Sequence, residues 1–326
     1  MGAHYSRSII MKSSSFWRIA ATVFAAGSIV YTTLSSSRSR RQSRERHEAG
    51  QGGSEYEYDV PVEYENVFEK NMIVPAGWSF GIVWSTIYSG LAALMVHQAL
   101  RSQENNPRYE KALPWWWTSW TLNAIFGRFF SENDPRSIVI SDLVTKFNLP
   151  AALALHQSLE IGKTDVPAPE KYLRIPVSVY AGWLTTATVV GTPNTLLTVN
   201  AWEPDEERDK LISAGILVAT AGAGYLIARR INDPWYMLPF VAGFGGIATR
   251  QLKKEPVVGW TGAILAAAYA GLLTYWLPKG KFHDYDRIVV HDTEVEVLAD
   301  PVETWEPHGT AIARERMKPI EAEGLD

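Results

Sequence analysis

The ionisable side chains that could do chemistry in this chain are few, and they lie within long apolar stretches. Asp142 and Lys146 are four residues apart with the acid first, which places them on one helix face as an ion pair. Inside a membrane such a pair is a functional candidate by default. The alternative is a helix that begins near Val144, with both charges among the lipid headgroups. His97 and His156 could ligate a haem iron or relay protons, but each is a lone histidine near a helix end.

Composition excludes several kinds of site. The 326 residues include no cysteine, so the chain has no disulfide framework, no thiol nucleophile and no thiolate metal site. A formal net charge of -4 gives no electrostatic footprint for nucleic acid. We find no metal cluster, no glycine-rich phosphate loop and no readable Ser/His/Asp arrangement. An enzyme therefore remains only an alternative, with Asp142, Lys146 or His156 as acid–base groups.

Aromatic side chains recur at helical spacing in three apolar segments. In the segment 75–100, Phe80, Trp84 and Tyr88 follow one another every four residues and share one helix face. The segment 114–130 carries the stripe Trp116, Trp120, Asn123 and Gly127, and the segment 173–199 carries Tyr180, Trp183, Ala187, Gly191 and Asn194. Because an amide in lipid needs a partner, we expect Asn123 to bond to another helix.

Membrane-spanning helices are needed to position these stripes. The mean hydropathy of -0.10 averages polar termini with a region, 74–277, in which apolar runs of helical length alternate with short charged loops. The sequence therefore predicts an all-α, polytopic transmembrane helical bundle. The predicted helices are 19–34, 75–100, 114–130, 138–161, 173–199, 211–228, 234–249 and 257–277. The first is either a retained helix, which we favour because no clear cleavage site precedes Ser35, or a cleaved signal peptide.

Three local patterns refine this arrangement. Asn148 and Pro150 predict a kink or broken turn in the segment 138–161. Small residues four apart in the segment 211–228, at Gly215, Ala219 and Ala223, predict a seam for close helix packing. The arginines within 38–46 favour a cytoplasmic location for the loop after the first helix, whereas the remaining positive charges nearly balance between the two sides.

The segment 75–100 resembles the signature at the start of the second helix of the tryptophan-rich sensory protein family, also called TspO or translocator protein. The matching residues are Pro75, Gly77, Trp78, Phe80, Gly81, Val83, Trp84 and Tyr88. Leu122, Asn123, Phe126 and Phe130 are similar to the third helix of that family, and Tyr180, Trp183 and Ala187 resemble its fifth. Gly191 stands where the family usually has asparagine. The resemblance covers residues 17–199 as five helices, so the chain resembles an extended TspO-related variant.

The resemblance implies a five-helix bundle with an aromatic pocket that binds a hydrophobic planar ligand, such as a porphyrin, another tetrapyrrole or a sterol-type lipid. The protein would act as a sensor, regulator or transporter. No cofactor is obligatory, although a porphyrin or haem-type ligand fits. Expected partners are the lipid bilayer, this small molecule and, as an open option, a second copy in a homodimer. The residues expected to bind the ligand are Phe80, Trp84, Tyr88, Trp120, Asn123, Phe126, Tyr180, Trp183 and Ala187.

The chain divides into four predicted regions. Residues 1–16 form an N-terminal tail, and 17–200 a TspO-like transmembrane core that includes a polar loop at 35–72. Residues 201–278 supply additional transmembrane helices, and 279–326 a soluble tail. Two other interpretations stay open. One is an enzyme that modifies the ligand, for example by porphyrin photodegradation, and the other is an assembly protein whose tryptophans only pack and leave no cavity between Trp84 and Trp183.

Overall fold

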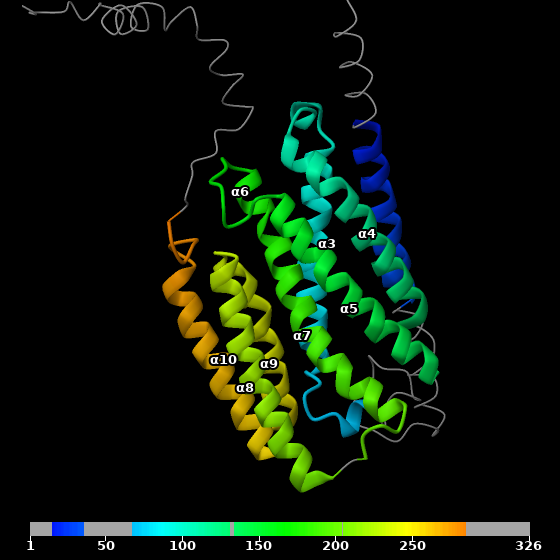
Figure 1. The fold of residues 1–326 in the computed structure, drawn as a ribbon, viewed down its shortest axis with the longest axis vertical. Coiled ribbons are helices and arrows are strands. Elements are labelled where there is room, and N and C mark those ends of the chain that lie inside the picture. Colours follow the sequence, from blue (N-terminus) through cyan, green and yellow to red (C-terminus); the bar gives the residue numbers. More distant parts are fainter. Residues whose placement is uncertain (1–14, 36–66, 131–133, 204, 285–326) are drawn as a thin grey trace, which may run out of the picture. The chain divides into compact units, whose positions relative to one another are not determined.

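The computed structural model describes residues 15–35, 67–130, 134–203 and 205–284 (Figure 1). These residues form helices joined by short connections and contain no strand. The long helices are 15–35, α3 (Gly77–Gln98), α4 (Pro107–Phe130), α5 (Pro135–Ser158), α7 (Ile175–Thr198), α8 (Glu206–Arg230), α9 (Leu238–Gln251) and α10 (Pro256–Trp276). Short helical turns are 67–70, η1 (Arg101–Gln103), α6 (Glu170–Leu173) and η2 (Pro234–Met237). The predicted all-α bundle is confirmed. The arginines within 38–46 and most of the predicted terminal tails lie outside the described residues.

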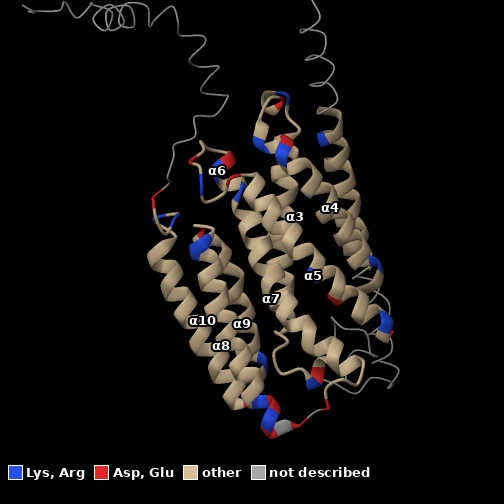
Figure 2. Ribbon diagram, in the orientation of Figure 1, with Lys and Arg blue, Asp and Glu red and all other residues tan. Residues whose placement is uncertain are grey.

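Successive long helices run in opposite directions, so the connections gather at two ends of the bundle (Figure 1). We call upper the end that holds residues 99–106, 159–174 and 231–237, and lower the end that holds 199–203 and 252–255. Charged residues gather at these two ends, and the middle has few of them (Figure 2). The helices α3, α5, α8 and α10 are long and apolar enough to cross a membrane. This distribution is that of a multi-pass bundle.

Five helices form a ring. Within it α4 packs on α5, α5 on α7, and α7 on α3. The helix at 15–35 completes the ring between α4 and α3: Phe24 stacks on Trp117 of α4 at 5.1 Å, and the Thr22 hydroxyl donates to the Met95 carbonyl of α3 at 3.1 Å. The helix at 15–35 is therefore packed as a member of the ring, and its retention in place of cleavage as a signal peptide stays a prediction.

The helices α8, α9 and α10 form a second layer, and α9 joins it to α3 and α7 of the ring. The glycines at this contact let the backbone of α9 approach the start of α3, and the backbone of α7 approach α9. A Cβ atom at Gly246 of α9 would lie 2.8 Å from Pro75 Cβ, and one at Gly182 of α7 would lie 2.9 Å from Pro239 Cγ. Ser79 also donates to the Ala242 carbonyl at 2.6 Å. The N-terminal end of α3 therefore packs against α9 of the second layer.

The predicted seam on α8 is wrong, because Gly215, Ala219 and Ala223 are exposed. A Cβ atom at Gly215 would meet nothing within 4 Å. The packed face of α8 instead carries Ala221 and Gly224, where a Cβ atom at Gly224 would lie 2.6 Å from Phe240 Cζ. Small residues occur on both sides of this helix, and the aromatic rings of α9 and α10 decide which side is buried.

Two expectations about α5 are also corrected. The helix begins at Pro135, so the alternative start near Val144 is wrong, and Asp142 lies two turns inside the helix. The helix also continues through Pro150, so the predicted broken turn is wrong, whereas the kink stays a prediction. Its first turn is capped by Asp134, which accepts hydrogen bonds from the Ser137 amide at 3.1 Å and from the Ser137 hydroxyl at 2.6 Å.

We expect Asp134→Ala to lower stability by about 1 kcal/mol at neutral pH, because α5 loses its cap. The hydrogen bond from the Ser137 hydroxyl lowers the pKa of Asp134. The contribution is therefore present above the unfolded-state pKa and is lost as pH falls through the folded-state pKa. Thermal unfolding in detergent at neutral pH and at about pH 3 tests this, since the difference between the two proteins should shrink in acid. A difference independent of pH would contradict it.

Candidate functional site

The three aromatic stripes meet inside the ring of helices and form one cluster, which we call the aromatic cluster. Trp84 lies at its centre: its ring stacks on Tyr88 at 4.9 Å and lies edge-on to Trp183 at 6.4 Å. Phe80 lies 5.4 Å from Trp183, and Tyr88 lies 6.1 Å from Trp120. Tyr180 completes the cluster, with its ring 6.4 Å from Trp84. Six of the predicted ligand-binding residues are thereby brought together from α3, α4 and α7.

The residues of the aromatic cluster and its surroundings differ in burial. Trp120, Tyr180 and Trp183 are buried. The three aromatic residues on α3 are only half-buried, although their side chains point toward the interior of the five-helix bundle. Along α7 every residue of 177–186 is buried, and every residue of 187–192 is half-buried. Burial along α7 therefore decreases directly below the aromatic cluster.

Asn123 finds its predicted partner on another helix, and the partner is Tyr180. The Asn123 amide donates to the Tyr180 hydroxyl at 2.7 Å, and the Asn148 amide of α5 donates to the same oxygen at 2.7 Å. The Ser119 hydroxyl donates to Asn148 Oδ1 at 3.1 Å. Buried polar groups that satisfy one another in this way hold three helices in register.

Asn148 is the member of this site that the sequence interpretation missed, because we read it only as a helix breaker. A signal was available, since Ser141, Thr145 and Asn148 follow one another at spacings of four and three on α5. Such a polar stripe on an otherwise apolar helix indicates a face that meets polar partners.

Phe126 and Ala187, the remaining predicted ligand-binding residues, lie on the lower side of the cluster. Phe126 stacks on Phe130 at 4.8 Å, one turn further along α4, and Ala187 follows Trp183 by one turn on α7. Both are half-buried. The structure places them below the aromatic cluster and not within it.

The Asp142–Lys146 ion pair is present, and it lies between α5 and α7. The Asp142 side chain is 3% exposed and that of Lys146 33%. Lys146 donates to Asp142 Oδ2, which also accepts a hydrogen bond from Thr195 of α7 at 2.7 Å. Gly191 faces this carboxyl group: a Cβ atom there would lie 3.1 Å from Asp142 Cγ and closer still to Oδ1.

The two histidines make separate contacts. His97 Nδ1 lies 3.0 Å from the Tyr109 hydroxyl, and His156 Nε2 lies 2.8 Å from Asp233 Oδ2 in a buried pair. Among the described residues, no three histidine, cysteine or acidic side chains are grouped so that they could hold a metal ion. The candidate binding groups are therefore the aromatic cluster and the Asp142 carboxyl group.

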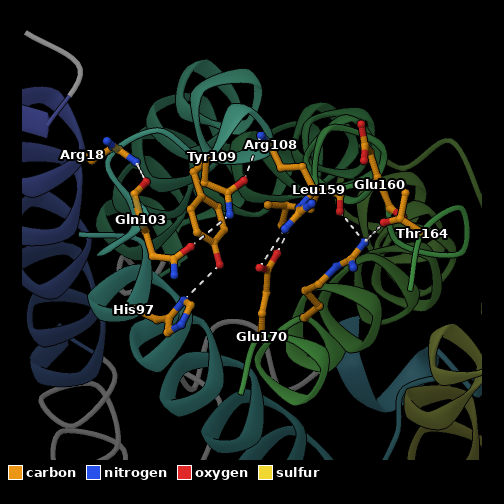
Figure 3. A network of polar contacts seen from close by, with 11 residues as sticks. Arg18, His97, Gln103, Arg108, Tyr109, Leu159, Glu160, Thr164 and Glu170 are labelled. Carbon is orange, nitrogen blue, oxygen red and sulfur yellow. Dashed lines mark hydrogen bonds and ion pairs between the residues drawn. The ribbon is translucent and has the colours of Figure 1, made fainter. Parts of the chain in front are cut away.

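A polar network at the upper end connects several helices and the loops between them (Figure 3). Arg108 donates two hydrogen bonds to Glu170, at 3.1 and 2.8 Å, and both side chains are buried. Arg174 donates to the Leu159 carbonyl, and Arg18 to the carbonyls of Gln103 and Glu104. Charges enclosed by partners in this way tie helix ends together. We assign this network a structural role.

Comparison with known families gives one result. A family model described as TSPO-like protein matches residues 62–275. Comparisons with curated proteins and with solved structures gave no match. The matched range begins before α3 and continues through α8 and α9 to the last turn of α10. It therefore extends beyond residue 199, where the resemblance of the motifs ended.

Proposed function

The chain belongs to the TSPO-like protein family and is an integral, multi-pass membrane protein, and from this premise we propose that it binds a hydrophobic planar ligand in the aromatic cluster. The ligand is a porphyrin, another tetrapyrrole or a sterol-type lipid. The protein acts on it as a sensor, regulator or transporter and not as a catalyst.

The observation that carries this proposal is the aromatic cluster itself. Its rings come from three helices, and those on α3 are half-buried while they face the interior. Flat apolar molecules stack on such rings, and offset or edge-on contacts between aromatic groups are favourable. Binding sites of this kind are apolar with a few placed polar groups. The Trp183 indole N–H, which is buried and has no hydrogen-bond partner among the described residues, supplies one such donor.

A titration with protoporphyrin IX tests the proposal. We expect saturable quenching of tryptophan fluorescence in the detergent-purified protein, beyond the inner-filter effect measured with a free tryptophan derivative. Linear quenching without saturation would contradict binding and favour a protein in which the tryptophans only pack. Porphyrin recovered after incubation in light and in darkness distinguishes binding from catalysis, because an enzyme would convert the ligand and a binding protein would return it unchanged.

A further inference from the structure

The exposed apolar face of α8 ends in two arginines. Leu211, Val218 and Leu226 lie on this face and are 65%, 57% and 67% exposed, and Arg229 and Arg230 follow one turn later. The helix is long and apolar enough to cross a membrane. The span from Leu211 to Arg229 corresponds to about 27 Å along the helix axis, which is close to the thickness of the hydrocarbon core of a bilayer. The two arginines therefore lie where the lipid headgroups begin.

The exposed face of α10 ends in the same way. Ile264 and Tyr275 on this face are 64% and 58% exposed, and Lys279 follows Tyr275 by four residues. The Lys279 ammonium group lies 3.6 Å from the centre of the Tyr275 ring and 4.8 Å from that of Trp276. Tyrosine and tryptophan are enriched at the membrane–water interface, and a cation is attracted to their ring faces. The rings therefore hold this lysine at the level of the headgroups.

Asn232 joins these two helix ends. Its side-chain oxygen accepts hydrogen bonds from the backbone amides of Phe282 and His283, at 2.8 and 3.0 Å. Its side-chain amide donates to the His283 carbonyl at 3.0 Å. Asn232 is buried and follows Arg230 by two residues. The segment 277–284, which continues from α10, is therefore fixed against the end of α8.

The cations at this place form one group, and we call Arg229, Arg230 and Lys279 the basic patch. All three side chains are exposed, and none forms an ion pair with another described residue. The acidic residue of the same segment, Asp284, pairs with Lys281 at 2.8 Å. Figure 2 shows Lys and Arg at this upper end of the second layer. Basic side chains beside a membrane surface attract anionic lipid.

The lower end of the same layer has a different charge pattern. Asp205 and Glu207 are exposed at the start of α8. Lys253 and Lys254 are also exposed, but Glu255 follows them directly. Acidic side chains beside these lysines oppose the approach of a second negative charge. An anionic lipid is therefore attracted more strongly to the upper end of the layer than to the lower end.

We propose that the basic patch binds the headgroup of an anionic phospholipid, whose chains lie along the exposed faces of α8 and α10. Arginine binds phosphate oxygens through two N–H donors at once, and lysine contributes a point charge. A soluble phosphate compound would meet the same cations, but it lacks the chains that the apolar faces contact. This site is separate from the aromatic cluster and does not depend on the proposed function.

Two phospholipids with the same chains test the site. Dioleoylphosphatidylglycerol carries a net negative charge, and dioleoylphosphatidylcholine carries none. Native mass spectrometry of the full chain in detergent gives the dissociation constant of the first lipid that binds. Because each basic residue contributes about fivefold at an anionic headgroup, we expect the anionic lipid to bind about a hundredfold more tightly. Equal affinities for the two lipids would overturn the inference.

Variants connect the preference to the basic patch. Arg229→Gln with Arg230→Gln removes two charges at exposed positions and should reduce the preference to about fivefold. Arg229→Lys with Arg230→Lys keeps both charges and should retain most of it. The matched control, Lys253→Gln with Lys254→Gln, removes two neighbouring charges from the lower end of the layer and should retain all of it. Equal losses in patch and control variants would overturn the inference, as would equal losses in the glutamine and lysine variants.

Glycerol phosphate distinguishes a lipid from a soluble phosphate compound, because it carries the charged group without the chains. We expect it to leave dioleoylphosphatidylglycerol bound when the two are present at equal concentration. Displacement of the lipid would overturn a lipid site and assign the patch to a soluble phosphate. Protoporphyrin IX enters none of these comparisons, so this inference and the proposed function can fail independently.

Discussion

Replacing Trp84 and Trp183 together by alanine is expected to weaken binding of protoporphyrin IX by about a hundredfold. Each loses an aromatic contact worth roughly 1 to 2 kcal/mol, and 1.4 kcal/mol corresponds to tenfold in affinity. The two indoles lie edge-on at 6.4 Å and come from α3 and α7, so the double variant removes two walls of the aromatic cluster. Fluorescence quenching by the porphyrin, followed through the remaining tryptophans, measures the loss.

Controls must separate lost contacts from lost folding, because Trp183 is a buried core residue and its removal destabilises the fold. The Trp84→Phe and Trp183→Phe variants retain most of the volume and should show a smaller loss in the same direction. Trp78→Ala and Trp260→Ala remove exposed tryptophans, 46% and 62% exposed, and should bind as the unmodified protein does. Equal losses for cluster and exposed variants would contradict a site at the aromatic cluster.

Glu170→Ala is expected to destabilise the protein by about 3 to 5 kcal/mol, because it removes one partner of a buried ion pair. Arg108 and Glu170 have side-chain exposures of 3% and 7% and are joined by two hydrogen bonds. Water cannot readily replace the carboxylate at this depth, so the guanidinium group loses its two-point partner. The midpoint of thermal unfolding in detergent should fall accordingly.

The same end of the bundle offers a matched control. Lys111 and Glu160 also form an ion pair, at 3.4 Å, but the Lys111 side chain is 62% exposed. Exposed pairs contribute about 0 to 1 kcal/mol, so Glu160→Ala should change the midpoint little. If the two variants were equally stable, the upper network would not hold the helix ends together as we describe.

Local patterns in the sequence determined much of this protein. Apolar runs of helical length predicted the long helices because burying backbone polar groups in a membrane requires them to pair within each segment. A spacing of four residues predicted the Asp142–Lys146 pair and the shared face of Phe80, Trp84 and Tyr88, because a helix has 3.6 residues per turn. The aromatic motif at the start of α3 indicated the family. Each of these inferences depends on residues within one helix.

The tertiary structure decided which helix faces contact each other and how far each helix is shifted along its axis relative to its neighbours. Periodicity could not show that Asn123 bonds to Tyr180, that the other face of α8 packs, or that Gly191 faces Asp142. These facts depend on the relative rotation and vertical register of helices far apart in the chain, and the pattern within one helix contains neither quantity. Packing of the side chains across several helices determines both. The aromatic stripes were therefore readable from the sequence, and their convergence into one cluster was established only by the structure.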